Sequence, residues 1–201
     1  MAFSIAGQRM MTAVILTTAM LVFTTATPSR AADNPIPAKA EQCVACHGEG
    51  GISQTENIPS LAGQPDLFTQ WQLVFFRAGT RKDEQMKPVS EDLSNEDIRK
   101  LGAYFATLSP PGKQSEPDPV LAKAGAEASA KGRCASCHGD NYAGTKGTAR
   151  VAGQREDYLV KALHDYKSGA RSGGAMAAMA SVANGLSDAD ITALAHYLSR
   201  M

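Results

Sequence analysis

The sequence predicts an all-α protein that contains two tandem copies of one small domain. Four sequence blocks recur in the same order about 90 residues apart, which indicates an internal duplication. Apolar residues at helical spacing end each copy, and no segment shows the apolar and polar alternation of a half-buried strand. Duplication and helical periodicity together give this fold class.

The first 31 residues have the pattern of a secretory signal. Arg9 precedes an uncharged run over residues 10–27, and the small residues Ser29 and Ala31 follow it. Cleavage after Ala31 would leave a mature chain that begins at Ala32. An uncleaved membrane anchor is the alternative, because a run of this length could nearly span a bilayer. The threonines in the run and the small-residue site favour cleavage, and therefore predict export to the periplasm.

Composition limits the function classes for the mature chain. The full sequence has 20 basic and 20 acidic residues, and removal of Arg9 and Arg30 leaves 18 basic residues against 20 acidic ones. This balance gives no indication of a nucleic-acid partner. Four cysteines in an exported chain could form two disulfides, but their spacing indicates another role.

The repeated blocks define the domain organisation. The block CVACHG returns as CASCHG with a displacement of 91 residues. LAGQ returns as VAGQ, and FRAGTR as YKSGAR, both with a displacement of 90. LSNEDIRKLGAYFATL returns as LSDADITALAHYLSRM with a displacement of 93. We expect a first domain over residues 32–108, a linker over 109–119 and a second domain over 120–201. Four prolines and a glycine in the linker forbid helix or strand continuity.

Three helices are expected in each domain. A terminal helix follows Ser94 and Ser187, which are placed as N-caps with an aspartate three residues later. A second helix is predicted over 66–78 and 156–168, and a glycine stops each copy. A third helix runs into the cysteine motif and is long in the second copy only. Each domain has only about 70 to 80 residues, so its side-chain core alone is marginal.

The CxxCH motif is the attachment pattern of c-type haem, and it occurs in both copies. Two cysteines three residues apart can form thioethers with the vinyl groups of one porphyrin, and the next histidine lies beneath the iron. The covalent haem ligands predicted in this way are Cys43, Cys46, Cys134 and Cys137, and the proximal iron ligands are His47 and His138. A redox dithiol or a zinc site is the alternative, but neither needs a histidine directly after both cysteine pairs.

The sixth iron ligand distinguishes an electron carrier from a catalyst, because a firm methionine ligand closes the iron to substrates. The mature chain offers Met86, Met176, Met179 and Met201. Met86 is predicted for the first haem. For the second haem the displacement of 90 favours Met176, whereas the displacement of 93 favours Met179, which lies seven residues before Leu186 as Met86 does before Leu93. We predict Met179, because the terminal helix anchors the loop that bears the ligand.

These motifs resemble the cytochrome c4 family over essentially the whole mature chain. The resemblance rests on two CxxCH units, each followed by an AGQ block, a glycine and arginine segment and a methionine seven residues before LSxxDI. It implies two class I cytochrome c domains that face each other across a pseudo-twofold axis, with haem propionates near their interface. It also implies a proline carbonyl that accepts a hydrogen bond from the proximal histidine.

The two copies differ at positions close to the expected haems. Pro59 fits the family proline in the first domain, but Ala149 stands there in the second, where the backbone carbonyl could still accept the bond. Phe68 corresponds to Tyr158, so a hydroxyl contact is possible only in the second domain. The two haems should therefore differ electronically.

Four further residues have two open interpretations each. Arg81 and Arg171 recur at matched positions and could pair with haem propionates, or they could be solvated surface residues. His164 and His196 lack a cysteine pair, so a surface or packing role is expected rather than iron ligation.

The sequence therefore predicts an exported dihaem carrier with two covalent haem c groups and no catalysis of its own. Family resemblance implies partners such as a terminal oxidase, a cytochrome bc1-type donor or a dehydrogenase, with possible peripheral membrane association. The alternative is a cytochrome subunit of a flavoprotein or other periplasmic dehydrogenase complex. An enzyme such as a dihaem peroxidase would need an iron site that opens.

Overall fold

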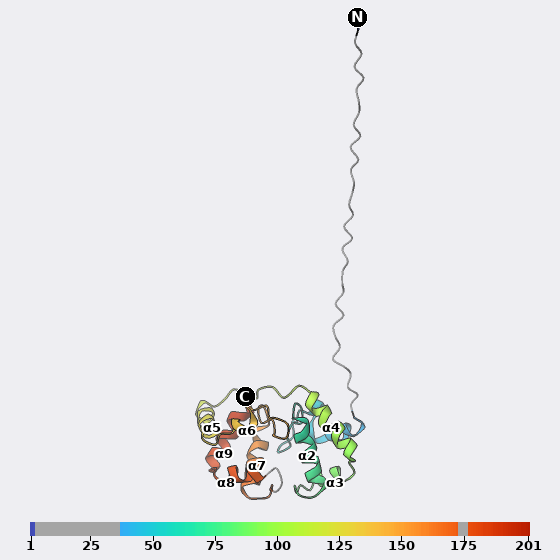
Figure 1. Ribbon diagram of the computed structural model, residues 1–201. Helices are drawn as coiled ribbons and strands as arrows, with labels where there is room; N and C mark the ends of the chain where they lie inside the picture. Colours follow the sequence, from blue (N-terminus) through green and yellow to red (C-terminus); the bar gives the residue numbers. More distant parts are fainter. Residues whose placement is uncertain (3–36, 173–176) are drawn as a thin grey trace. The chain divides into compact units, whose positions relative to one another are not determined.

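The computed structural model describes residues 1–2, 37–172 and 177–201 (Figure 1). The predicted signal sequence and Met176 lie outside these residues. Within the described part of the chain, no helix is long and apolar enough to cross a membrane.

The described structure is helical, as predicted, with two halves of similar element order. The first half contains η1 (Ala38–Ala40), α1 (Glu41–His47), η2 (Glu49–Gly51), α2 (Asp66–Arg77), α3 (Met86–Glu91) and α4 (Asn95–Thr107). The second half contains α5 (Pro119–Lys131), α6 (Ala135–His138), α7 (Glu156–Lys167), α8 (Ala177–Asn184) and α9 (Asp188–Ser199). Over residues 37–172 and 177–201 the only β-type pairings are two isolated bridges, Arg81 with Arg171 and Thr145 with Thr148.

The helix ends follow the sequence signals closely. Ser94 and Ser187 each accept a hydrogen bond from the backbone N–H three residues on, and Asp97 and Asp190 complete the two capping boxes. Helices α2 and α7 each end two residues before a glycine with positive φ. Asp118 caps α5, with Pro119 as its first residue.

Two elements differ from the sequence prediction. The helix expected to run into the second cysteine motif breaks at Gly132 and Arg133, where Arg133 has φ of 52° and a new short helix then begins. The stretch around Met86 is polar and shows no helical apolar pattern, yet Met86 begins the helix α3. A helix this short is fixed by its packing on α2 rather than by its own apolar pattern.

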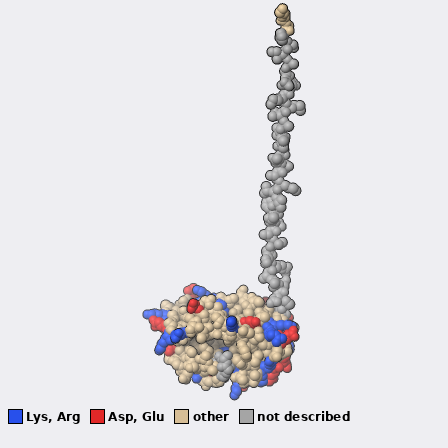
Figure 2. Space-filling view, in the orientation of Figure 1, with Lys and Arg blue, Asp and Glu red and all other residues tan. Residues whose placement is uncertain are grey.

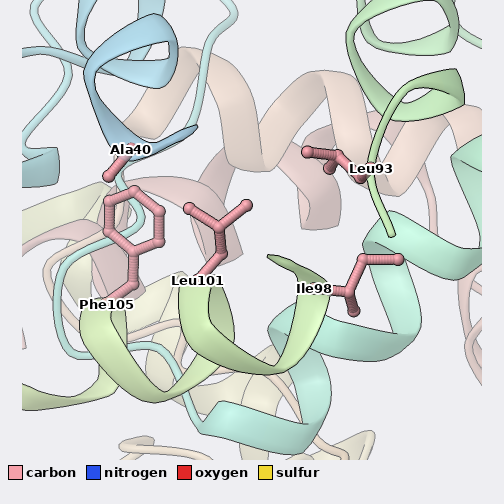
Figure 3. Packing of buried hydrophobic residues seen from close by; sticks show 5 residues of the cluster. All are labelled: Ala40, Leu93, Ile98, Leu101 and Phe105. Atoms are coloured by element: carbon pink, nitrogen blue, oxygen red, sulfur yellow. The ribbon is translucent and has the colours of Figure 1, made fainter. Parts of the chain in front are cut away.

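Each half has a small apolar core beside its terminal helix. In the first half, Ile98, Leu101 and Phe105 on α4 pack with Ala40 and Leu93, and all five are at most 3% exposed (Figure 3). In the second half the core is formed by Tyr142, Ala152, Leu159, Ala195 and Leu198. These clusters are small, as expected for domains of about 70 to 80 residues, so a prosthetic group would add to the buried apolar surface.

Surface charge is mixed on the face shown in Figure 2. Acidic and basic side chains are interspersed there, and no broad area of one sign is visible. This distribution agrees with the balanced composition of the chain.

Glycines allow helices to cross closely in both halves. An added Cβ at Gly102 on α4 would meet side-chain atoms of Asp66 and Gln70 on α2 and, at 2.9 Å, the backbone oxygen of Asp66. One at Gly125 on α5 would lie only 2.2 Å from the backbone oxygen of Ala193 on α9. Backbone atoms cannot move aside as a flexible side chain can, so Gly125 is the more restrictive position.

We therefore expect Gly125→Ala to lower the free energy of unfolding by about 1–3 kcal/mol through overpacking. Denaturant unfolding of the haem-loaded protein measures this change. Gly112→Ala is the matched control, because nothing lies within 4 Å of the added Cβ there. Equal free energies of unfolding for Gly125→Ala and Gly112→Ala would contradict the close crossing of α5 and α9.

Candidate functional site

Each half presents its CxxCH motif on one short helix that ends at a glycine. Helix α1 contains the first motif, and Cys134 and α6 form the second. Gly48 and Gly139 terminate the two motifs with nearly the same backbone angles, φ of 80° and 82°. A side chain at Gly48 would collide with the backbone of Ile52, so the chain can turn sharply after the histidine only with glycine there.

The motif histidines are buried and held by one hydrogen bond each. His47 is 7% exposed, and its Nδ1 lies 2.7 Å from the carbonyl oxygen of Pro59. His138 is 9% exposed, with Nδ1 2.8 Å from the carbonyl oxygen of Ala149. The hydrogen bond expected for Pro59 is therefore confirmed, and Ala149 supports an equivalent bond.

Burial also sets the protonation state of these two rings. Desolvation lowers the pKa of both His47 and His138, so each imidazole is neutral at neutral pH. A neutral ring that donates through Nδ1 leaves Nε2 with a free lone pair. This is the tautomer that a metal-ligating histidine needs.

The cysteines do not have the character of a redox dithiol or a metal cluster. All four are free, and burial, together with the neighbouring Cys46, raises the pKa of Cys43 to about 11. Redox-active cysteines have lowered pKa values instead. Among residues 1–2, 37–172 and 177–201, no three histidine, cysteine or acidic side chains are grouped so as to hold a metal ion. The raised pKa of Cys43 does not fit a redox dithiol, and a histidine directly after each cysteine pair fits covalent haem attachment.

The methionine candidates lie on the short helices before the terminal helices. Met86 is the first residue of α3, and Met179 lies in α8; both are half-buried. Met179 packs beside the buried Tyr166 and Ala183, together with Phe75 from the first half. No structural comparison with Met176 is possible, since it lies outside the described residues.

Two glutamines join the halves through reciprocal hydrogen bonds that the sequence analysis did not identify. Gln64 Oε1 accepts from the N–H of Arg150 (3.0 Å) and its Nε2 donates to the carbonyl of the same residue (2.8 Å). Gln154 makes the same pair of bonds to Ser60, at 2.8 and 2.9 Å. The recurring AGQ block was the sequence feature that marked these glutamines. A repeat alone does not show that each glutamine bonds to the backbone of the other copy.

Two arginines meet at the centre of the junction. Arg81 and Arg171 both donate to Oε1 of Gln72, at 2.7 and 2.8 Å, and both contact the hydroxyl of Tyr158, at 3.2 and 3.4 Å. Burial opposes ionisation of Tyr158, but the two guanidinium groups outweigh it and lower its pKa to about 8. The junction is therefore strongly electropositive. Arg171 is only 5% exposed, so it is not the solvated surface residue that the sequence also allowed.

Two buried polar atoms near this junction have no partner among the described residues. They are Nε of Arg171 and Oγ1 of Thr69. Buried donors are nearly always hydrogen-bonded, and two adjacent cations need a counter-charge. The donor set fits an anionic group such as a haem propionate.

The other histidines have structural positions. His164 is exposed on α7. His196 is 5% exposed; its Nε2 accepts from the N–H of Asp118, and its Nδ1 lies 3.3 Å from Glu156. His196 therefore links the start of α5 to α9, which is a packing role.

A helical protein with two domains, each with a CxxCH motif, a buried neutral histidine and a small core, is a dihaem c-type cytochrome. Comparisons with known proteins agree with this class. A family model described as cytochrome c matches residues 122–201, and one described as subunit III of cbb3-type cytochrome c oxidase matches residues 37–105.

Similar proteins define the family more closely. Cytochrome c4 of Azotobacter vinelandii is 34% identical over 177 residues, covering 80% of this chain and 84% of the relative. The thiosulfate dehydrogenase electron acceptor of Thiomonas intermedia is 31% identical over 173 residues, covering 81% and 80%. The crystal structure of reduced recombinant cytochrome c4 from Pseudomonas stutzeri has a TM-score of 0.73 and 32% identity, covering 81% of this chain and 96% of that chain.

The chain belongs to the cytochrome c4 family. It is an electron-transfer cytochrome rather than an enzyme, and its two motifs fit two covalently bound haem c groups.

Haem stoichiometry tests the two motifs separately. We expect two haems per chain that remain on the polypeptide after acid and acetone extraction, as a pyridine haemochrome assay measures. The double variants Cys43→Ser with Cys46→Ser, and Cys134→Ser with Cys137→Ser, should each retain one covalent haem, because each removes both thioethers of one domain. Two covalent haems in either variant would contradict the assignment.

Proposed function

We propose that this chain is a periplasmic dihaem carrier that passes electrons from respiratory donors to a terminal oxidase or another acceptor. When bound, each haem c supplies a one-electron Fe(III)/Fe(II) couple. The protein's own contribution is to ligate, bury and orient two such centres side by side. Reciprocal hydrogen bonds of Gln64 and Gln154 support this role, because they hold the two domains in one arrangement.

The observation that best supports a carrier is the matched placement of Met86 and Met179. Four positions after each methionine, Ser90 and Ala183 are fully buried, and three positions after it, Val89 and Val182 are 36% and 38% exposed. The residues with matching exposure lie 93 positions apart in the sequence, as Met86 and Met179 do. We therefore assign His47 and Met86 to one iron and His138 and Met179 to the other. A methionine thioether favours the ferrous state and closes the sixth position to substrates.

The arginine pair at the junction is assigned to the haem propionates. Arg171 is buried with an unpaired Nε, and neither it nor Arg81 has a carboxylate partner within 4 Å among the described residues. Bidentate contact of a guanidinium with a carboxylate would satisfy these donors.

Export of the chain follows from the sequence of its first 31 residues. The charged, apolar and small-residue order over these positions supports a cleaved signal and a periplasmic location. Covalent haem attachment in both domains is consistent with this compartment.

A second candidate is an electron-accepting subunit of a dehydrogenase. Relatives include two thiosulfate dehydrogenase electron acceptors. Leu67 and Trp71 on α2 are 45% and 49% exposed, whereas Asp157 and Lys161 stand at the equivalent positions of α7. This exposed apolar pair, which is replaced by charged residues at the matching positions of the second domain, supports contact with a dedicated partner protein.

Purification from native periplasm discriminates the two roles. A free carrier should elute alone and oxidise rapidly when mixed with membranes that contain a terminal oxidase. A subunit should co-elute with a dehydrogenase in a fixed ratio. Slow electron exchange with both the oxidase-containing membranes and the dehydrogenase would contradict an electron-transfer function.

Methionine substitutions test the ligand of the second haem. Met179→Ala should abolish the sulfur-to-iron charge-transfer absorption of one haem and lower its reduction potential, since it removes the thioether that favours Fe(II). Met176→Ala is the matched control and should leave both bands unchanged. The reverse result would show that the displacement of 90, rather than 93, gives the ligand.

Two methionine-ligated irons should also be closed to small molecules. We expect the oxidised protein to be low-spin and to bind cyanide or peroxide slowly, and the reduced protein to bind carbon monoxide slowly, because each ligand must first displace a thioether. Electron paramagnetic resonance and stopped-flow absorption measure these properties. Rapid peroxide turnover, or a large high-spin fraction, would favour a catalytic iron instead.

A further inference from the structure

Each motif histidine is connected by hydrogen bonds to a glutamine of the opposite domain. His47 Nδ1 donates to the carbonyl of Pro59 (2.7 Å), and the N–H of Ser60, in the same peptide unit, donates to Oε1 of Gln154 (2.8 Å). The second domain repeats this arrangement. His138 Nδ1 donates to the carbonyl of Ala149 (2.8 Å), and the N–H of Arg150 donates to Oε1 of Gln64 (3.0 Å).

The two chains of hydrogen bonds cross the domain junction in opposite directions. Each one runs from a histidine, through one peptide unit, to a glutamine that belongs to the other copy. We call them the first relay (His47, peptide 59–60, Gln154) and the second relay (His138, peptide 149–150, Gln64). Corresponding members differ by 90 or 91 residues in the sequence, which follows the internal repeat.

Both relays are buried and oriented by additional bonds. Gln64 is 5% exposed and Gln154 is 4% exposed. The Nε2 atoms of Gln64 and Gln154 donate to the carbonyls of Arg150 and Ser60, so a flipped amide would lose two bonds at once. The glycine before each glutamine donates its N–H to a terminal helix, to Phe105 in the first domain and to Leu198 in the second. The amide oxygen is therefore fixed on the peptide N–H.

A peptide unit transmits polarisation from its N–H to its carbonyl. When the N–H donates a hydrogen bond, electron density shifts toward the carbonyl oxygen, which then becomes a better acceptor for the histidine Nδ1–H. A stronger bond at Nδ1 makes the imidazole more basic, and a more basic ligand stabilises Fe(III) over Fe(II). Gln154 thus acts on the ligand of the first haem and Gln64 on that of the second.

We propose that Gln64 and Gln154 are positioning residues that lower the reduction potential of the haem in the opposite domain, and so couple domain docking to the redox properties of each haem. This inference rests on His47 and His138 being the proximal iron ligands. The domain that supplies the glutamine differs from the domain that holds the affected haem, and a purely local structural role does not predict this crossed dependence.

The variants Gln154→Leu and Gln64→Leu test the proposal in the intact haem-loaded protein. Each removes the acceptor of one peptide N–H with little change of volume. We expect Gln154→Leu to raise the potential of the first haem and Gln64→Leu that of the second. A threefold change of the Fe(III)/Fe(II) equilibrium is expected, which corresponds to about 28 mV at 59 mV per tenfold change for one electron.

Nuclear magnetic resonance during a redox titration gives the potential of each haem separately. Haem methyl signals are assigned to a domain through their contacts with sequence-assigned residues. Gln114→Leu is the matched control, because Gln114 donates to the backbone carbonyl of Gln154 but belongs to neither relay. It should leave both potentials unchanged.

Hydrogen exchange at the histidine ring provides a second readout that does not depend on the potentials. In the reduced protein, Gln154→Leu should speed exchange of the His47 Nδ1–H and leave that of His138 unchanged, and Gln64→Leu should do the opposite. Gln154→Glu retains an acceptor for the Ser60 N–H and should preserve slow exchange at His47.

Two results would overturn the relays. Equal shifts of both haems in each glutamine variant would indicate loosening of the junction, and shifts confined to the haem of the mutated domain would indicate a local effect. The assignment of the proximal ligands, on which this inference rests, fails separately if His47→Ala and His138→Ala leave the absorption spectra and the potentials of both haems unchanged.

Discussion

The hydrogen bond from each motif histidine to a backbone carbonyl is the interaction on which the rest of the structure depends. It fixes the ring plane of His47 and His138 and holds the proton of the neutral ring on Nδ1, so that Nε2 is free for the proposed bond to iron. It also fixes the loop that follows the motif. Because that loop continues into the AGQ segment, the same bond places Gln64 and Gln154 at the domain junction. Ligand geometry and domain docking therefore have one common origin.

Size explains why the haems matter for folding as well as for electron transfer. Each domain has only about 70 to 80 residues, and a domain this small is marginal without a further stabilising element. A covalently attached porphyrin supplies the missing apolar surface. Nε of Arg171 and Oγ1 of Thr69 are buried and have no partner among the described residues, and an anionic group such as a haem propionate would accept hydrogen bonds from them.

Duplication did not produce two equal halves. Gln72 of the first domain stands where the second has Ala162, and Tyr158 of the second stands where the first has Phe68. Both polar side chains serve the same pair of arginines, so the centre of a nearly symmetric junction is asymmetric. The electrostatic environment therefore differs on the two sides of the junction.

The sequence by itself determined the features that depend on neighbouring residues. Both CxxCH motifs, both capping boxes and the ends of α2 and α7 follow from contacts within a few residues, and the carbonyl of Pro59 followed from family resemblance. Only the tertiary structure decided the partners of Gln64 and Gln154, which lie 86 and 94 residues away. It also revealed the helices α3 and α8 and the break at Gly132 and Arg133. Local hydrogen-bond and capping rules can be recognised in a sequence, whereas pairings across a junction exist only once two separate surfaces have packed.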